Sequence, residues 1–152
     1  MQTIKFKLLH KDAKLPSRAH DTDAAFDVIA VSREIKDGYI SYGFGFSTEI
    51  PAGWEAKVYP RSSISNYDLV LTNGVGVIDS AYRGEWGARF KLLDYVVATN
   101  EEAGEESSPR LYNVGDRIAQ IQFQRVPEVR FEVVEELNDS TRATGGFGST
   151  GA

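Results

Sequence analysis

Cysteine is absent from this 152-residue chain, which excludes a disulfide, a thiolate zinc site and a thiol nucleophile. The two histidines, His10 and His20, lack a spacing typical of a metal site. No run approaches the roughly 20 apolar residues that a membrane span needs, and the N-terminus lacks the apolar core of a signal peptide. We therefore expect a cytoplasmic protein that does not bind a membrane.

Basic residues are outnumbered by acidic ones, 17 against 22, which gives a net charge of −5. Binding along a nucleic-acid backbone needs a basic face, so this balance argues against a nucleic-acid partner. A phosphate ligand is therefore expected to be small and to occupy a locally basic pocket. The length of the chain suits one domain with a real hydrophobic core.

Apolar and polar residues alternate in several stretches, which is the two-residue repeat of a half-buried strand. These stretches are 4–8, 54–59, 86–92, 119–124 and 129–133. Turn-forming residues lie between them at 36–38, 50–53 and 113–116. Because no longer segment shows a sustained helical repeat, the sequence predicts an all-β fold. We expect a jelly-roll-like barrel or two-sheet sandwich.

The pattern divides the chain into a β domain, residues 1–137, and a flexible glycine-rich arm, residues 138–152. Residues 99–109 are acidic and rich in turn formers, which predicts a solvated loop within the domain. The arm carries groups that suit a nucleotide, although its glycines cannot form a packed element. Arg142 suits a bidentate phosphate contact, and the ring of Phe147 offers a flat surface to a base.

Two internal segments carry further candidate groups. Residues 60–63 place Arg61 beside two serine hydroxyls, a combination that suits a phosphate or a sugar. Residues 73–85 look like a tight hairpin closed by glycines, whose backbone can approach a ligand closely. Within it, Asp79 follows an apolar pair and suits either a general base or a turn-capping carboxylate.

A third segment, residues 115–120, predicts a turn followed by a strand. Asp116 and Arg117 are neighbours there, which favours an ion pair within the segment. In the strand that follows, Gln120 is expected to point away from the apolar face.

Taken together, five segments in fixed order resemble the motifs of the trimeric dUTPases, which hydrolyse dUTP to dUMP and pyrophosphate. The segments are 22–27, 60–63, 73–84, 115–120 and 142–151. The resemblance covers almost the whole chain, and the third and fifth segments are the most specific. It implies a homotrimer with a jelly-roll fold. It also implies an enzyme that removes dUTP from the nucleotide pool and supplies dUMP for thymidylate synthesis.

The resemblance also implies a role for each matching residue. Asp79 is expected to be the general base that holds the attacking water and to contact the 3′-hydroxyl of deoxyribose. Gln120 is expected to help place that water. Tyr82 is expected to stack on the deoxyribose and exclude a ribose 2′-hydroxyl. The residues expected to read the uracil edge are Asn73, Gly76, Val77 and Ile78. Those expected to bind the α- and β-phosphates are Arg61, Ser62 and Ser63.

The arm is expected to close over the γ-phosphate and the base, at a site shared between subunits. Its ligand-binding residues would be Arg142, Phe147, Gly148, Ser149 and Thr150. Mg²⁺ is the implied cofactor, gripped chiefly by the three phosphates, with Asp27 holding it through water. The acidic loop resembles an insertion, which is either a tolerated surface loop or a contact for a protein partner. The chain departs from the common family pattern at Ser63, Ala25-Phe26 and Ala143.

Two other functions share this fold. A dCTP deaminase needs a carboxylic acid on the strand after the hairpin, but that position is Arg89, which cannot shuttle protons at neutral pH. A non-catalytic interaction module would use the acidic loop as its contact. The intact set of Asp79, Gln120 and Arg142 argues against a loss of activity.

Overall fold

The computed structural model describes residues 2–93 and 108–145, and their regular secondary structure is almost entirely β-strand. Within them the elements are β1 Lys5–Leu8, β2 Phe26–Ile29, β3 Ser32–Lys36, β4 Tyr39–Gly43, β5 Phe46–Glu49, β6 Trp54–Pro60, the 3₁₀ helix η1 Ser62–Asn66, β7 Leu69–Leu71, β8 Gly76–Ile78, β9 Gly87–Leu92 and β10 Arg117–Arg125. No helix in this part of the chain is long and apolar enough to cross a membrane.

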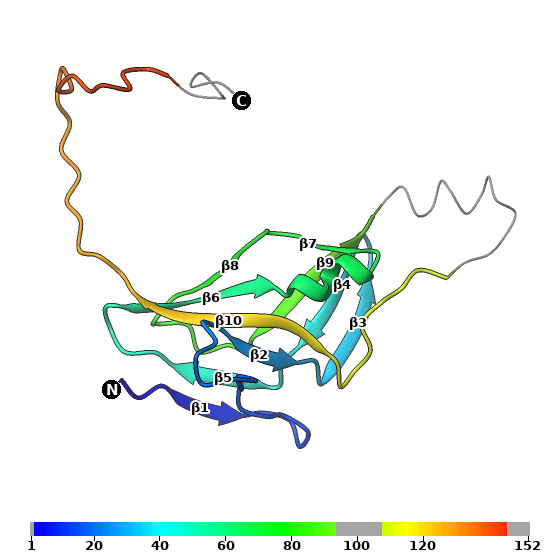
Figure 1. The fold of residues 1–152 in the computed structure, drawn as a ribbon. Helices are drawn as coiled ribbons and strands as arrows, with labels where there is room; N and C mark the ends of the chain where they lie inside the picture. Colours follow the sequence, from blue (N-terminus) through cyan, green and yellow to red (C-terminus); the bar gives the residue numbers. More distant parts are fainter. Residues whose placement is uncertain (1, 94–107, 146–152) are drawn as a thin grey trace, which may run out of the picture.

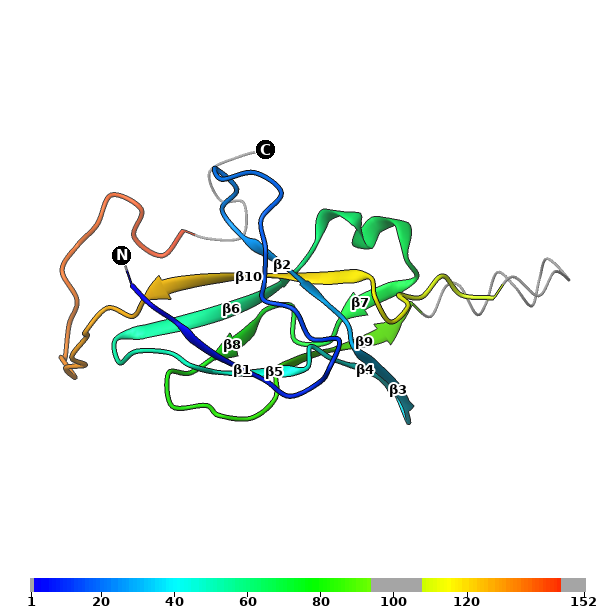
Figure 2. The ribbon, with the colours of Figure 1, turned by 90° about the horizontal axis from the view of Figure 1, so that it is seen from below.

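The strands form three sheets, with the orders β1-β5, β2-β10-β6-β8 and β3-β4-β9-β7. All strand pairs within them are antiparallel, and none of the three sheets closes on itself. Figures 1 and 2 show the two four-stranded sheets side by side, with β1 and β5 along one flank. The predicted all-β, jelly-roll-like fold is confirmed, in its open sandwich form.

The core lies between the sheets and is rich in aromatic rings. The Phe90 ring centroid lies 5.7 Å from that of Tyr42 and 5.7 Å from that of Tyr112. All three side chains are fully buried. The Tyr42 hydroxyl donates a hydrogen bond to the Tyr112 carbonyl at 3.0 Å, which satisfies a polar atom inside the core.

Four of the five predicted alternating segments are strands, namely β1, β6, β9 and β10. In β6 the alternation places Ala56 and Val58 in the core, as predicted. In β10 the pairing register with β2 shifts between Arg117 and Ala119, so that both Ile118 and Ala119 are buried. The turns predicted at 36–38, 50–53 and 113–116 are also present, each with a glycine at positive φ.

The prediction of a fifth strand at residues 129–133 is wrong for the single chain that the structure describes. After β10 the described residues 126–145 contain no strand and run away from the sheets (Figures 1 and 2). The Phe131 side chain is 92% exposed and Val133 is fully exposed. Alternation of apolar residues produces a strand only when a sheet edge and an apolar surface are available to it, and this segment pairs with neither in the described part of the chain.

The prediction of a tight hairpin at 73–85 is also wrong, because the strands of this region do not pair with each other. Before the turn at Gly74, strand β7 pairs with β9, whereas β8 after the turn pairs with β6 in the other four-stranded sheet. The segment therefore crosses between the two sheets, and β8 becomes an edge strand. We call this segment the Asn73–Glu85 loop.

Asp68 forms hydrogen bonds with the chain on both sides of the acidic loop, residues 99–109. Its carboxylate accepts the backbone N–H of Arg110 at 2.7 Å, and its carbonyl accepts that of Leu93 at 3.1 Å. The residue is only 6% exposed, and the hydrogen bond from the Arg110 backbone N–H lowers the pKa of its carboxyl group.

We predict that Asp68→Asn destabilises the protein near pH 7 and has less effect in acid. A lowered carboxyl pKa stabilises the fold above the unfolded-state pKa of about 3.9, and this contribution is lost as pH falls through the folded-state value. Denaturant unfolding of both proteins at pH 7 and at about pH 3 measures the difference. A gap in stability that is the same at both values would contradict a role for the charged carboxylate.

Candidate active site

The Asn73–Glu85 loop forms one wall of a cavity of about 670 Å³. We call this the loop cavity. Six residues predicted to bind the nucleoside line it together, namely Asn73, Gly76, Val77, Ile78, Asp79 and Tyr82. Because β8 has a strand partner on one side only, its other backbone edge is available to a ligand. That is the arrangement expected of a backbone that reads a base.

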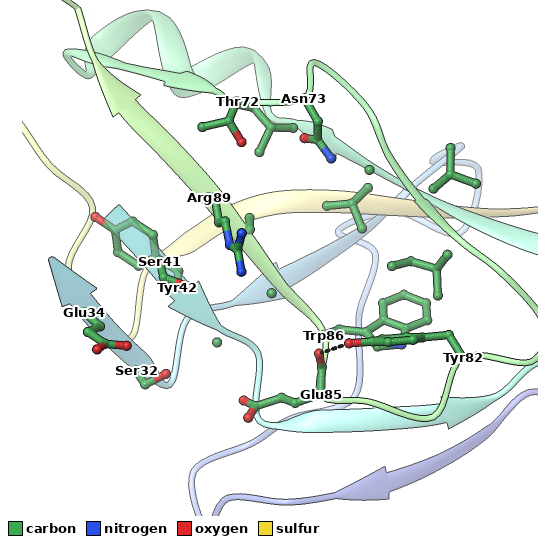
Figure 3. Close-up of a pocket in the computed structure, with 18 of the residues that line it drawn as sticks. Ser32, Glu34, Ser41, Tyr42, Thr72, Asn73, Tyr82, Glu85, Trp86 and Arg89 are labelled. Atoms are coloured by element: carbon green, nitrogen blue, oxygen red, sulfur yellow. Dashed lines mark hydrogen bonds between the residues drawn. The ribbon is translucent and has the colours of Figure 1, made fainter. Parts of the chain in front are cut away.

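Tyr82 is held against its own loop. Its hydroxyl donates to the Glu85 carbonyl at 3.2 Å (Figure 3), and its backbone N–H donates to the Asp79 carbonyl at 3.0 Å. A Cβ at Gly84 would lie within van der Waals overlap of the Tyr82 ring, so only glycine allows the ring to fold back here. The side chain is 45% exposed, which leaves part of the ring open to a ligand.

The far wall of the loop cavity comes from the other four-stranded sheet. Figure 3 shows Glu34, Ser41 and Arg89 there, apart from Asn73 and Tyr82. Asp79 also lines this cavity and is exposed directly after β8. An exposed carboxylate can exchange protons with a bound water, as a general base must.

The second group of predicted residues surrounds Asp27. Both carboxylate oxygens accept from Arg61, at 2.7 Å from Nε and 3.2 Å from Nη2, in the bidentate geometry of a strong ion pair. Arg117 Nη1 lies 3.2 Å from the same carboxylate. The ion pair predicted between Asp116 and Arg117 is therefore wrong, because Arg117 pairs with Asp27 and Asp116 accepts the backbone N–H of Asn113.

These residues line a second cavity of about 640 Å³, which we call the arginine cavity. Of the predicted residues it contains Asp27, Arg61, Ser62 and Gln120. Gln120 lies opposite Asp27 across the β2–β10 pair and points away from the core, as predicted. Its Nε2 donates to the Pro60 carbonyl at 3.0 Å, so its Oε1 is the atom left to accept from a water.

Ser63 does not line the arginine cavity, although it was predicted to bind phosphate. Its hydroxyl accepts from Arg61 Nη1 at 3.1 Å, so it helps to orient that guanidinium.

Of the departures from the family pattern, Ala143 is the one with an unusual backbone. Its φ is 45°, and it is the only non-glycine residue with positive φ among those described.

The two cavities share no lining residue. Val58 lines the loop cavity, whereas Tyr59, the next residue of β6, lines the arginine cavity. Since successive side chains of a strand point to opposite faces of its sheet, the cavities lie on opposite sides of β6. One chain therefore separates the groups predicted to bind the nucleoside from those predicted to bind the phosphates.

The described residues of the arm, 138–145, line neither cavity. Arg142 is exposed, and its Nε donates to the Gly145 carbonyl at 2.9 Å in a local turn. Phe147, Gly148, Ser149 and Thr150 lie outside the described residues, as does most of the acidic stretch at 99–109.

Sequence reasoning missed two arginines of the arginine cavity, Arg18 and Arg117. Arg117 belongs to segment 115–120, one of the five that resemble dUTPase motifs. Its position beside Asp27, however, depends on the register of β2 against β10. Arg18 precedes the first of these five segments, 22–27, and no local sequence pattern identifies it as a cavity residue.

A magnesium ion bound through water needs few protein ligands. The described residues contain no cluster of three or more acidic or histidine side chains. Asp27 Oδ1 accepts one hydrogen bond, so it keeps a lone pair for a metal-bound water. This donor set fits a hydrated ion that a ligand's phosphates hold, and it does not fit a cage made of protein groups.

Comparison with known proteins gives one consistent result. The family model for dUTPase matches residues 11–151. A deoxyuridine 5′-triphosphate nucleotidohydrolase of Clostridium tetani is 37% identical, over 98% of this chain and 97% of the relative. That of Corynebacterium glutamicum is also 37% identical, over 99% and 96%.

Solved structures agree. The dUTPase of Staphylococcus bacteriophage 80alpha, with dUpNHpp bound, has a TM-score of 0.75 and 26% identity over the whole of both chains. A point mutant of the dUTPase from phage phi11 of S. aureus, described with a structural Mg(II) ion, has a TM-score of 0.71 and 25% identity over 91% of this chain and all of the other. The chain thus belongs to the dUTPase family.

Proposed function

We propose that this dUTP diphosphatase hydrolyses dUTP to dUMP and pyrophosphate by attack of water on the α-phosphorus, with Asp79 as general base and Mg²⁺ as cofactor. It would thereby remove dUTP from the cytoplasmic nucleotide pool and supply dUMP for thymidylate synthesis. The observation that carries the proposal is the gathering of six predicted nucleoside-binding residues in the loop cavity.

The loop cavity supports the choice of base and sugar. The free backbone edge of β8 can pair with the uracil edge, and its close approach would leave no room for the methyl group of thymine. The Tyr82 ring, fixed by its hydrogen bond to Glu85, would pack on the deoxyribose where a 2′-hydroxyl would clash. Asp79, at the end of the same strand, would contact the 3′-hydroxyl and take the proton of the attacking water.

The arginine cavity supports phosphate binding. Arg61 is fixed by Asp27 and Ser63, so its guanidinium is oriented before a ligand arrives. It would stabilise the negative charge that develops on the phosphates, and Gln120 Oε1 would orient the water. When bound, Mg²⁺ would neutralise part of the triphosphate charge, and Asp27 would hold its hydration shell.

We further propose that the active site is shared between subunits of a homotrimer. A nucleoside in the loop cavity cannot place its phosphates in the arginine cavity of the same chain, because the two lie on opposite sides of β6. A second copy can supply the missing half. The segment after β10 also favours assembly, since Val129, Phe131 and Val133 are exposed in the single chain.

The arm, including Phe147, Gly148, Ser149 and Thr150, would close over the bound nucleotide and exclude water. Ala143 is consistent with a turn at the start of this closing segment. The deaminase alternative is disfavoured because Arg89, which occupies the position of its carboxylic acid, lines the loop cavity. A protein-binding role of the acidic loop could coexist with hydrolysis.

We predict that Asp79→Asn lowers turnover of dUTP by roughly 10²–10⁴-fold, the usual range for a positioned base. Binding of a non-hydrolysable dUTP analogue should change little, because the amide keeps the shape of the carboxylate. Asp37→Asn, an exposed carboxylate in the β3–β4 turn, is the matched control and should leave turnover unchanged. Near-normal pyrophosphate release from folded Asp79→Asn protein would exclude Asp79 as the base.

We predict that Tyr82→Ala raises kcat/KM for UTP relative to dUTP, because removal of the ring makes room for a 2′-hydroxyl. Tyr82→Phe keeps the ring and loses only the hydrogen bond to Glu85, so it should preserve most of the discrimination. Steady-state kinetics with both nucleotides measures the ratio. If Tyr82→Ala left the ratio as it is in the wild type, the sugar would be selected elsewhere.

We predict that two inactive variants, Asp79→Asn and Arg61→Ala, restore activity when they are unfolded and refolded together. Each variant damages a different cavity, so a site built from two chains is complete about one time in four under random assembly. Activity near a quarter of the wild type is expected. Mixed trimers, verified by differential tagging, that showed no more activity than the sum of the separate variants would contradict the shared site.

A further inference from the structure

Arg18 lines the arginine cavity, and a β-bridge between its neighbour Ser17 and Asp27 holds it there. The Ser17 N–H donates to the Asp27 carbonyl at 3.2 Å, and the Asp27 N–H donates to the Ser17 carbonyl at 2.7 Å. The side chain of Asp27 pairs with Arg61. The bridge therefore fixes the backbone of Arg18 next to the residues proposed to bind phosphate.

Two contacts hold the Arg18 side chain. Its guanidinium carbon lies 4.8 Å from the centroid of the Phe26 ring, within the range of a cation–π interaction. Its Nη1 donates to the Asp23 carbonyl at 3.3 Å. The Asp23 carboxylate meanwhile accepts the backbone N–H of His20 at 2.9 Å. The ring thus restricts the orientation of a guanidinium that is otherwise on a flexible stem.

The charges around the cavity are unequal. Arg61 and Arg117 both pair with Asp27, so each is partly neutralised before a ligand binds. Among residues 2–93 and 108–145, Arg18 forms no ion pair with a carboxylate. It is therefore the arginine of this cavity whose charge is least neutralised, and an anion would gain most from it.

We propose that Arg18 is a further binding residue for the phosphate chain of the nucleotide, and that Phe26 is its positioning residue. This inference rests on the proposed function for the nature of the ligand. A guanidinium presents paired N–H donors that match phosphate oxygens, and the hydrogen bond to the Asp23 carbonyl uses Nη1 of Arg18. Asp27 and the Ser17 bridge would bring Arg18 and Arg61 to the same phosphate chain.

Calorimetric binding to the Arg18→Ala variant tests the contact. We expect the Kd of a non-hydrolysable dUTP analogue with Mg²⁺ to rise about tenfold, as for the loss of one charge-assisted contact that water partly screens. Titrations with dUMP and dUDP show which phosphate is involved, because only ligands that reach Arg18 should lose affinity. Unchanged Kd values for all three ligands would overturn the proposal.

Lys11→Ala removes the same charge from an exposed turn of the same N-terminal segment, and it should leave all Kd values unchanged. An equal loss in Lys11→Ala and Arg18→Ala would show a general charge effect and would overturn the contact. Wild-type protein that binds the analogue but releases no pyrophosphate from dUTP would instead contradict the proposed function.

Phe26→Leu tests the positioning role, since it keeps an apolar side chain but removes the ring under the guanidinium. It should weaken binding of the dUTP analogue less than Arg18→Ala does. In the Arg18→Ala/Phe26→Leu double variant, the second substitution should cause no further loss of affinity for the analogue, because Phe26 acts through Arg18. Thermal unfolding verifies that each variant is folded. Losses that add in the double variant would exclude Phe26 as the positioning residue.

Discussion

The carboxylate of Asp27 joins three segments that are far apart in the sequence. It is on β2, it binds Arg61 at the end of β6, and it binds Arg117 at the start of β10. These strands are neighbours in one sheet, so the ion pairs act on a framework that backbone hydrogen bonds already fix. Because the arginines cannot lose their charge at neutral pH, they need a carboxylate to be held close together without a ligand. The arginine cavity depends on this arrangement.

The same sheet explains why the predicted active site is divided within one chain. A strand has two faces, and β6 contributes Val58 to one cavity and Tyr59 to the other. The Asn73–Glu85 loop crosses from one sheet to the other, and this crossing makes β8 an edge strand with a free backbone. An exposed edge is a common risk for aggregation, but here it lies beside a cavity in which a base can occupy it. The geometry that separates the cavities therefore favours a site completed by a second subunit.

The segment after β10 fits the same interpretation. Its alternation of apolar and charged residues is as regular as that of β6, yet its apolar side chains are exposed. Such a segment gains free energy from burial only against another molecule, at about 25 cal/mol for each Å² of apolar surface. The sequence pattern thus indicates a strand that has no pairing partner among residues 2–93 and 108–145.

The sequence by itself determined the β class, four of the strands, the turns with glycine at positive φ, and the membership of the dUTPase family. These features depend on local alternation, on glycine conformation and on short motifs, all of which neighbouring residues carry. Only the tertiary structure decided the pairing of β8 with β6, the ion pair of Arg117 with Asp27, and the position of Arg18 at a cavity. Those features depend on strand register and on contacts between distant segments, and a local pattern holds no record of either.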